Sequence, residues 1–350
     1  MTLHLLPTQF VASPVHLADG AAVRLAGGMQ WFAAYEVREG GARRTVSVAE
    51  VATLGERAVA LHARITAPRP PLQLGERTLR FDQPAMAGIL NVTPDSFSDG
   101  GAHAGDPAGA AAAGTDMLVA GAALVDVGGE STRPGATTVW EGDEIARAVP
   151  VVERLARGGA LVSIDTRKAA VMEAALAAGA AIVNDVSALL WDDRALDVVV
   201  RSGAPVVLMH SPDPKDGGHG RTGYRDVVTE VFDWLDARIA AVVAAGVPRT
   251  RIVADPGIGF GKTLAENLQL LNGLAMFHGL GVPLMLGASR KRLIGALSNE
   301  APADQRLGGS IALAIRGADA GVQLHRVHDV AATVQALRVW RGLRDQALVG

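Results

Sequence analysis

The sequence predicts an α/β protein, a (β/α)8 TIM barrel with a small N-terminal accessory extension. From Met86 onward a short apolar run, a Gly-rich or polar break and an Ala-rich helical stretch recur, as in parallel βα units. About eight such runs fit into about 260 residues, the number and size expected of a barrel. The 41 Gly and only 4% aromatic residues favour tight βα turns over an aromatic-rich β-sandwich. A doubly wound open sheet would alternate in the same way, so the count of runs carries the prediction.

Each apolar run is interpreted as one barrel strand. The predicted strands are residues 86–90, 122–127, 161–164, 181–183, 205–209, 251–254, 283–286 and 322–325. Helix signals lie between them. Asp106 followed by Pro107 predicts an N-cap with proline at the first helical position. Glycines at 179, 203 and 246 predict helix ends just before the next strand.

Residues 1–70 have a different pattern and are interpreted as an accessory α+β or β domain of unassigned role, ahead of a barrel domain at 71–350. A β-hairpin is predicted from 29–37 through Gly40 and Gly41 to 45–48. A proline-rich break follows at 68–71. Residues 73–82 predict a second hairpin, which in a barrel would cover the N-terminal mouth.

Charge and composition exclude several classes of function. Lys and Arg total 33 against 36 Asp and Glu, a net charge of −3, which argues against a nucleic-acid partner. The absence of Cys excludes disulfides, thiolate metal sites and thiol catalysis. No positive charge precedes Arg24, and no uncharged apolar run reaches the roughly 18 residues of a membrane span. We therefore expect a soluble, cytoplasmic protein without a membrane partner.

Polar residues follow nearly every predicted strand. In a (β/α)8 barrel the C-terminal ends of the strands carry the active site. Any one short polar residue there is more simply explained as a helix cap. Together they bring acids, amides and cations to one mouth, so they predict a site. They are Asn91, Asp126, Asp165, Asn184, Asp185, His210, Asp255, Ser289, Arg290, Lys291, Arg326 and His328.

Two loops are longer than the entry to a helix requires. The first, residues 91–101, holds Asp99 and an isolated Phe97 among Ser, Thr and Gly. The second, residues 126–135, holds Thr132 and Arg133 among small residues. Such loops are either tolerated insertions or lids. We favour lids, because their charged residues would close over a reacting anion.

The segment from Asp255 to Thr263 nearly matches a phosphate-binding P-loop, but Pro256 stands where the first glycine is required. The remaining interpretation is a glycine turn that lets backbone approach a planar ligand, with Phe260 either stacked on that ligand or in the core. The chain has four lysines, at 168, 215, 262 and 291, so each Lys hints at a chemical requirement. Lys291, between two arginines, is a candidate for holding a phosphate or carboxylate.

Arg326 and His328 end the last predicted strand at alternate positions, so their side chains project to the same face. This is the usual phosphate-binding corner of such barrels. No His, Asp and Glu set has zinc-ligand spacing. Any metal is therefore expected to be a hard cation such as Mg²⁺, held by oxygen ligands and substrate phosphates.

The motifs resemble those of the dihydropteroate synthases, in order and with suitable spacing over about residues 73–345. The matching segments are 91–101, 128–134, 163–166, 184–185, 255–262, 289–291 and 326–329. The resemblance implies a barrel that joins 6-hydroxymethyl-7,8-dihydropterin diphosphate to 4-aminobenzoate. It also implies a homodimer and an SN1-like reaction, in which diphosphate leaves before the amine attacks.

The resemblance also implies a role for each candidate residue. The residues expected around the pterin are Asp165, Asn184, Asp255 and Lys291. The residues expected at the diphosphate are Asn91, Arg326 and His328, with Mg²⁺ bound through Asn91. Those expected to close over the reacting centre are Asp99, Thr132 and Arg133. Phe260 and Lys291 would form the aminobenzoate slot together with Phe97 and Pro134.

Three departures and three rival hypotheses accompany the resemblance. Residues 1–70 exceed the common family core, and the resemblance assigns them no role. The loop after His210 lacks the family's usual Met-Gln and Pro-Thr-Met stretch, and Arg292 replaces a Ser found in some members. A methyltransferase barrel that uses methyltetrahydrofolate should lack both long loops. A non-catalytic homologue should have lost loop or diphosphate residues. A Schiff-base aldolase would need a desolvated Lys262 or Lys291.

Overall fold

The barrel predicted from the sequence is confirmed by the computed structural model, which describes residues 2–93, 105–131, 136–216 and 223–349. Eight parallel strands form one sheet, and a bridge between Ala254 and Leu284 joins its first and last strands into a closed barrel. Each predicted run coincides with one strand. The strands are β7 (Ala85–Asn91), β8 (Leu124–Gly128), β9 (Val162–Asp165), β10 (Ile182–Asp185), β11 (Val206–Met209), β12 (Ile252–Asp255), β13 (Met285–Leu286) and β14 (Leu324–Val327).

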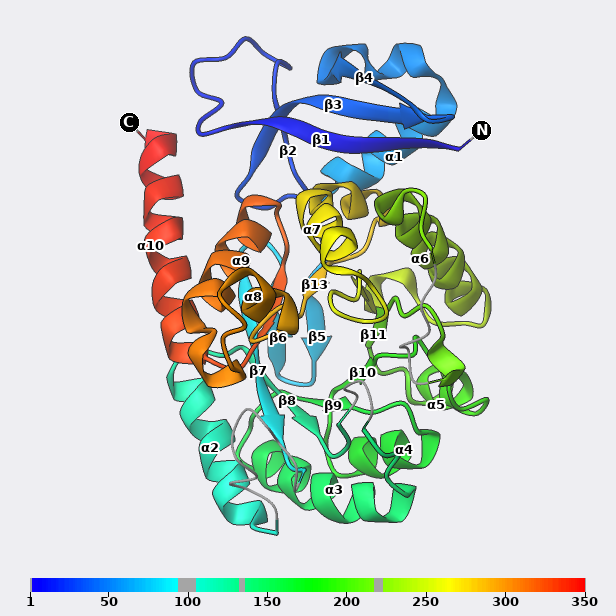
Figure 1. Cartoon of the computed structure of the whole chain (residues 1–350), viewed down its shortest axis with the longest axis vertical. Helices are drawn as coiled ribbons and strands as arrows, with labels where there is room; N and C mark the ends of the chain where they lie inside the picture. The colour runs from blue at the N-terminus through cyan, green and yellow to red at the C-terminus, as the bar shows by residue number, and fades with distance from the viewer. Residues whose placement is uncertain (1, 94–104, 132–135, 217–222, 350) are drawn as a thin grey trace.

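Helices surround the barrel (Figure 1). They are α2 (Pro107–Val119), α3 (Glu141–Arg157), α4 (Ala169–Ala177), α5 (Ala195–Ser202), α6 (Val227–Ala244), α7 (Leu264–Asn272), α8 (Arg292–Leu297), α9 (Leu307–Asp319) and α10 (Val330–Val349). Short 3-10 helices are η2 (Pro214–Asp216), η3 (Arg249–Arg251), η4 (Leu274–Leu280) and η5 (Ala303–Gln305). Asp106 caps α2 as predicted, accepting from the N–H of Gly109 at 2.9 Å. Within the described residues, no helix has the length and apolar character needed to cross a membrane.

A short hairpin closes the N-terminal mouth of the barrel, as predicted. It consists of β5 (Leu72–Leu74) and β6 (Arg77–Leu79). Leu72, Leu79 and Phe81 are buried in one apolar cluster with residues near the start of each barrel strand. Those strand residues are Ala87, Leu124, Leu161, Ile182, Val207, Val253, Met285 and Leu324. A ligand therefore has to approach from the opposite mouth.

The N-terminal extension is a small antiparallel sheet with one helix. Its elements are β1 (Leu3–Val11), β2 (Val23–Arg24), β3 (Trp31–Glu39), β4 (Ala42–Ser47), η1 (Val48–Leu54) and α1 (Glu56–Thr66). The predicted hairpin is β3 and β4, joined by Gly40 and Gly41 with φ of 58° and 85°. Such φ values suit a two-residue hairpin turn and are easy only for glycine. Strand β1 was not predicted, because Pro7 interrupts its pattern. Helix α1 was not predicted either.

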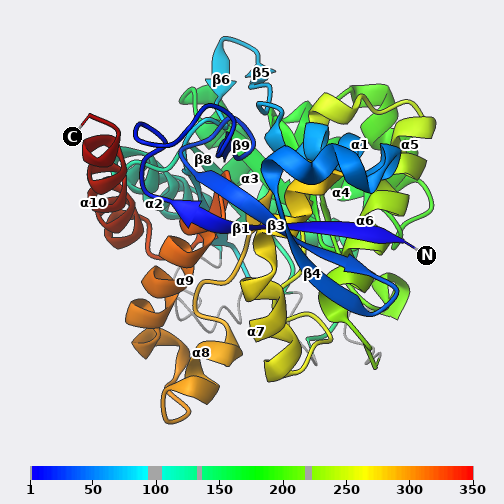
Figure 2. The same ribbon diagram turned by 90° about the horizontal axis from the view of Figure 1, so that it is seen from above.

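The N-terminal extension packs against one side of the barrel (Figures 1 and 2). Its β1 and α1 lie against η4, and its apolar side chains share one buried cluster with Phe232 and Phe277 of the barrel. Helix α6 presents three aspartates to it. Arg38 pairs with Asp226 at 3.3 Å, His4 with Asp233 at 2.8 Å and Arg64 with Asp236 at 3.3 Å.

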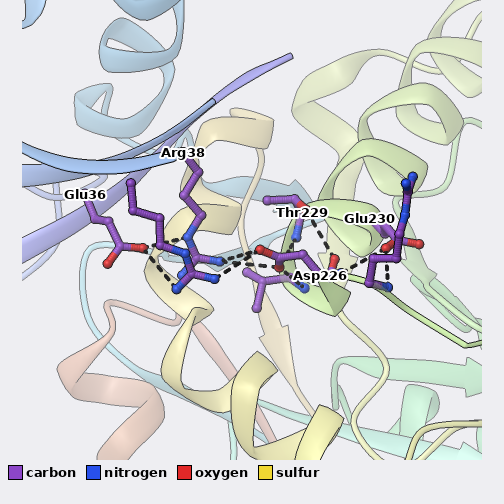
Figure 3. Close-up of polar contacts among 8 residues, drawn as sticks. Glu36, Arg38, Asp226, Thr229 and Glu230 are labelled. Carbon is purple, nitrogen blue, oxygen red and sulfur yellow. Dashed lines mark hydrogen bonds and ion pairs between the residues drawn. The ribbon is translucent and has the colours of Figure 1, made fainter. Parts of the chain in front are cut away.

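The contact of Arg38 with Asp226 (Figure 3) gives a stability prediction. Asp226 also caps α6, accepting from the N–H of Val228 at 3.1 Å. Asp226→Ala should therefore cost about 1–2 kcal/mol of unfolding free energy through the lost cap, beyond any ion-pair energy. Arg38→Ala should cost about 0.5–1 kcal/mol, because surface pairs contribute little. Urea denaturation of the single and double variants measures both, with exposed Arg44→Ala as control. Equal losses for Arg38→Ala and Asp226→Ala would contradict the capping role.

Candidate active site

Side chains from four strands meet at the open mouth in one hydrogen-bonded network. Arg326 of β14 donates from Nε to Asp126 Oδ2 of β8 at 2.6 Å, and from Nη2 to Asp165 Oδ2 of β9 at 2.6 Å. Asn184 of β10 donates from Nδ2 to Asp126 Oδ2 at 3.1 Å. Parallel strands end at the same edge, so polar residues far apart in the chain converge there. The predicted convergence of strand-end residues is observed.

Asp165 offers a ready hydrogen-bond acceptor. Its Oδ1 atom is buried and has no hydrogen-bond partner within the described part of the chain. Burial raises the pKa of Asp165 to about 7, with Asp126 adding to the shift and Arg326 opposing it. A buried acceptor without a partner is costly. A ligand donor placed here would remove that cost, and the amide oxygen of Asn184 is the second acceptor available nearby.

Asp255 and Lys291 face each other across the neighbouring part of the mouth. Asp255 Oδ1 accepts from the N–H of Gly257 at 2.7 Å, and burial raises the pKa of Asp255 although Lys291 opposes the shift. Lys291 Nζ donates to the carbonyl of Ile258. Burial lowers the pKa of Lys291 to about 8, against the effect of Asp255. The pair brings one carboxylate and one ammonium group to the same part of the mouth.

Phe260 lies in the site and not in the core. Its ring centroid is 4.5 Å from Nζ of Lys291, a cation–π contact, and its side chain is only partly buried. The glycine turn makes this possible. Gly257 has φ of 72°, and a Cβ there would lie 1.9 Å from the carbonyl oxygen of His210. Only glycine fits at this close approach.

Asn91 is placed to share its oxygen with this site. A Cβ added at Gly128 would lie 3.6 Å from Asn91 Oδ1 and 3.6 Å from Asp165 Oδ2, so both oxygens border the space that Gly128 leaves open. An amide oxygen is a ligand type that Mg²⁺ accepts. Among the described residues no three His, Asp or Glu side chains gather as a ready metal cage. Asn91 therefore fits a cation that takes its other ligands from a substrate and water.

The three consecutive cations Arg290, Lys291 and Arg292 have different surroundings in the structure. Arg290 forms a two-pronged pair with Asp329, at 2.9 Å from Nε and 2.5 Å from Nη2. Arg292 is exposed, so only Lys291 of the three points to Asp255. His328 Nδ1 lies 3.0 Å from Ser289 Oγ at the end of β14. Arg326 and His328 thus come from one strand but have different partners.

A buried network of ion pairs beside the mouth was not predicted from the sequence. Glu130 pairs with Arg167 at 3.1 Å and with Lys168 at 3.0 Å, and Lys168 also meets Glu144 at 2.5 Å. Glu130 Oε1 accepts from the N–H of Val139 at 2.8 Å. The scarcity of lysine was a usable signal for Lys168. Its carboxylate partners, Glu130 and Glu144, could not be predicted from the sequence, because they come from two other segments.

Three predicted catalytic residues, Asp99, Thr132 and Arg133, lie outside the residues that the structure describes, as do Phe97 and Pro134. Their roles stay predictions. The remaining candidates are described, and they lie at the C-terminal end of the barrel. The mouth therefore combines carboxylates and an amide for a donor-rich ring, a lysine beside an aromatic face, and a strand end with a histidine.

Comparison with known proteins identifies the family of this chain. Residues 87–328 match the family described as pterin binding enzyme. The dihydropteroate synthase of Neisseria meningitidis is 43% identical over 276 residues, 77% of this chain and 96% of that protein. A structure of Xanthomonas albilineans dihydropteroate synthase with 4-aminobenzoic acid has 48% identity and a TM-score of 0.73, covering 79% of this chain and 98% of that one. Another, in complex with 7,8-dihydropteroate, has 45% identity and a TM-score of 0.70, covering 79% and 99%.

Proposed function

The chain belongs to the pterin binding enzyme family that includes the dihydropteroate synthases, and we propose that its barrel joins 6-hydroxymethyl-7,8-dihydropterin diphosphate to 4-aminobenzoate. The products are 7,8-dihydropteroate and diphosphate. The enzyme is a transferase of the dihydropteroate synthase type. The observation that carries the proposal is the cluster of Asp165, Asn184 and Asp255 at the mouth, with the Oδ1 atom of Asp165 lacking a described partner.

The pterin would occupy the inner part of the mouth. Its guanidine-like edge is rich in N–H donors and requires carboxylate or amide acceptors. Asp165 Oδ1, the Asn184 amide oxygen and Asp255 supply them. Lys291 would donate to the exocyclic carbonyl or to a ring nitrogen. Because Arg326 already neutralises part of the charge of Asp126 and Asp165, the acidic cluster can persist without a bound ligand.

The diphosphate would lie at the end of β14, near His328 and within reach of Arg326. The bond between the pterin methylene carbon and the diphosphate oxygen breaks, and its electron pair leaves with the diphosphate. Stabilising that developing charge is the main catalytic task. Mg²⁺, when bound through Asn91 and diphosphate oxygens, would neutralise part of the leaving-group charge. Asp99, Thr132 and Arg133 are proposed to close over the cation that remains.

The aromatic amine would then attack the methylene carbon from a slot beside Phe260 and Lys291. The new carbon–nitrogen bond forms, and the amine nitrogen then releases one proton to water or to the departed diphosphate, which balances the reaction. The ring of Phe260, which Lys291 contacts, would give an apolar wall to the benzene ring. A related enzyme has been crystallised with 4-aminobenzoic acid, which supports such a slot. A homodimer and a cytoplasmic location stay predictions.

Incubation with the pterin diphosphate, 4-aminobenzoate and Mg²⁺ tests the function. We expect release of one diphosphate for each dihydropteroate formed, and chromatography with a coupled diphosphate assay measures both. Omission of 4-aminobenzoate is the control. Pterin binding without turnover in the complete mixture would favour a non-catalytic homologue. Neither binding nor turnover would reject the proposed function.

A further inference from the structure

The side chain of Lys262 is hydrogen-bonded to the backbone of the glycine turn, residues 257–261, next to the proposed slot beside Phe260 and Lys291. Its Nζ donates to the carbonyl of Gly257 at 2.8 Å and to the carbonyl of Phe260 at 3.1 Å. Lysine is rare in this chain, and no ion pair to a carboxylate is formed by Lys262 in the described part of the chain. Its position is therefore explained by the turn and not by charge neutralisation.

The turn needs such a support because its own residues do not fix its shape. Gly257, Gly259 and Gly261 all have positive φ, at 72°, 85° and 56°. Glycine has more backbone freedom to lose than any other residue, so an ordered run of three requires hydrogen bonds from outside. The carbonyl of Phe260 is one of the groups that Lys262 holds, so the bond acts next to the ring.

Asn267 of α7 holds the same turn from the other side. Its Oδ1 accepts from the N–H of Gly259 at 2.6 Å, and its Nδ2 donates to the carbonyls of Lys262 at 3.1 Å and Thr263 at 2.8 Å. The side chain is buried, with 3% exposure. Thr263, in the position where a P-loop would bind Mg²⁺, instead caps α7. The segment that resembles a P-loop thus forms a hydrogen-bonded turn that carries Phe260.

We propose that Lys262 and Asn267 are positioning residues that hold the Phe260 ring against Lys291 and so set the affinity and selectivity of the slot for a flat aromatic amine. The inference rests on the proposed function. Neither side chain is placed to touch the pterin or the diphosphate, because their polar atoms are bound to the turn. Burial, then Lys291, lowers the pKa of Lys262 to about 7, with Asp255 and Glu266 opposing.

The test compares Lys262→Met, Lys262→Arg and Asn267→Ala with the wild type, and uses Lys215→Met as a matched control on an exposed lysine. We expect Lys262→Met and Asn267→Ala to raise the KM for 4-aminobenzoate about tenfold and to reduce discrimination against 3-aminobenzoate. The KM for the pterin diphosphate should change less than twofold. Lys262→Arg, which can still donate to two carbonyls, should restore much of the loss. Hydrogen exchange of the peptide spanning 256–262 should become faster in the Met and Ala variants.

The outcomes separate this inference from the function on which it rests. Equal weakening of both substrates, or an unchanged KM for 4-aminobenzoate, would overturn the positioning role. If the wild type forms no dihydropteroate, the proposed function fails. Hydrogen exchange then tests by itself whether Lys262 and Asn267 hold the turn that carries Phe260. Exchange at 256–262 that is the same in all variants would overturn the inference. If Lys262→Met fails to fold, Asn267→Ala and Lys262→Arg carry the same comparison.

Discussion

Replacing Asp165 with alanine is expected to weaken the binding of a pterin by about 30- to 1000-fold. The change removes a buried carboxylate whose Oδ1 has no partner in the described structure, and leaves ligand donors unpaired. One or two charge-assisted hydrogen bonds are worth about 2–4 kcal/mol in total. Asn184→Ala should have a smaller effect in the same direction, because an amide is a weaker acceptor. Titration calorimetry with a pterin that lacks diphosphate measures both changes.

The neighbouring Asp185 provides a matched control for this pocket. Its carboxylate is buried but already accepts from the N–H of Ser187 at 2.7 Å and of Leu189 at 2.9 Å. Asp185→Asn should therefore lower the melting temperature while changing pterin affinity less than twofold. Unchanged pterin affinity in both Asp165→Ala and Asn184→Ala would mean that the pterin lies elsewhere.

The pH dependence of pterin binding gives the same prediction a second readout. Burial, reinforced by Asp126, raises the pKa of Asp165 to about 7 in the free enzyme, despite Arg326. Below that pH the carboxyl is protonated and must lose its proton to accept from the ligand. Affinity should therefore rise with pH by up to about tenfold per unit and level off above about 7. Asp165→Asn should remove this dependence, and a wild-type profile without it would argue against Asp165 as the acceptor.

The sequence was sufficient for the barrel and for the identity of the inner site. A strand buried on both faces is a short apolar run, and the first polar residue after it lies at the mouth. Asp165, Asn184 and Asp255 could therefore be placed from the chain alone. Their mutual contacts could not. Arg326 was assigned to the diphosphate, whereas the structure shows it bound to Asp126 and Asp165, since pairing across the barrel depends on rotamers.

Partners distant in the chain account for most of what the sequence could not reveal. Glu130, Glu144 and the pair Arg167 and Lys168 come from three separate segments, and only the fold brings them together in one buried network. Asn267 lies inside a helix with no visible function. The extension is another such case. Its hairpin was predictable from Gly40 and Gly41, but its docking on α6 depends on aspartates more than 170 residues away, such as Asp226 opposite Arg38.

His328→Ala and Arg326→Ala are expected to have different effects, although the two residues are only two positions apart at the end of β14. His328 lies against Ser289, with its Nδ1 atom 3.0 Å from Ser289 Oγ. Its replacement should weaken binding of diphosphate by about 10- to 150-fold, the value of one charge-assisted hydrogen bond, about 1.5–3 kcal/mol. The affinity for a pterin without diphosphate should change less than twofold. Calorimetric titrations with inorganic diphosphate and with the pterin, each with Mg²⁺, measure both.

Arg326→Ala should weaken both ligands and destabilise the fold. Arg326 pairs with Asp126 and Asp165 at 2.6 Å each, so its removal leaves two largely buried carboxylates without their cation. Breaking such a pair costs about 3–5 kcal/mol of unfolding free energy. Arg326→Lys keeps the charge but loses the planar guanidinium whose Nε and Nη2 reach Asp126 and Asp165 separately, and should lie between the wild type and Arg326→Ala. If Arg326→Ala spares the pterin, the ion pairs do not shape its pocket. If His328→Ala weakens both ligands equally, the diphosphate does not lie at the end of β14, because the loss of a residue that contacts only the leaving group cannot weaken the binding of a pterin that lacks it.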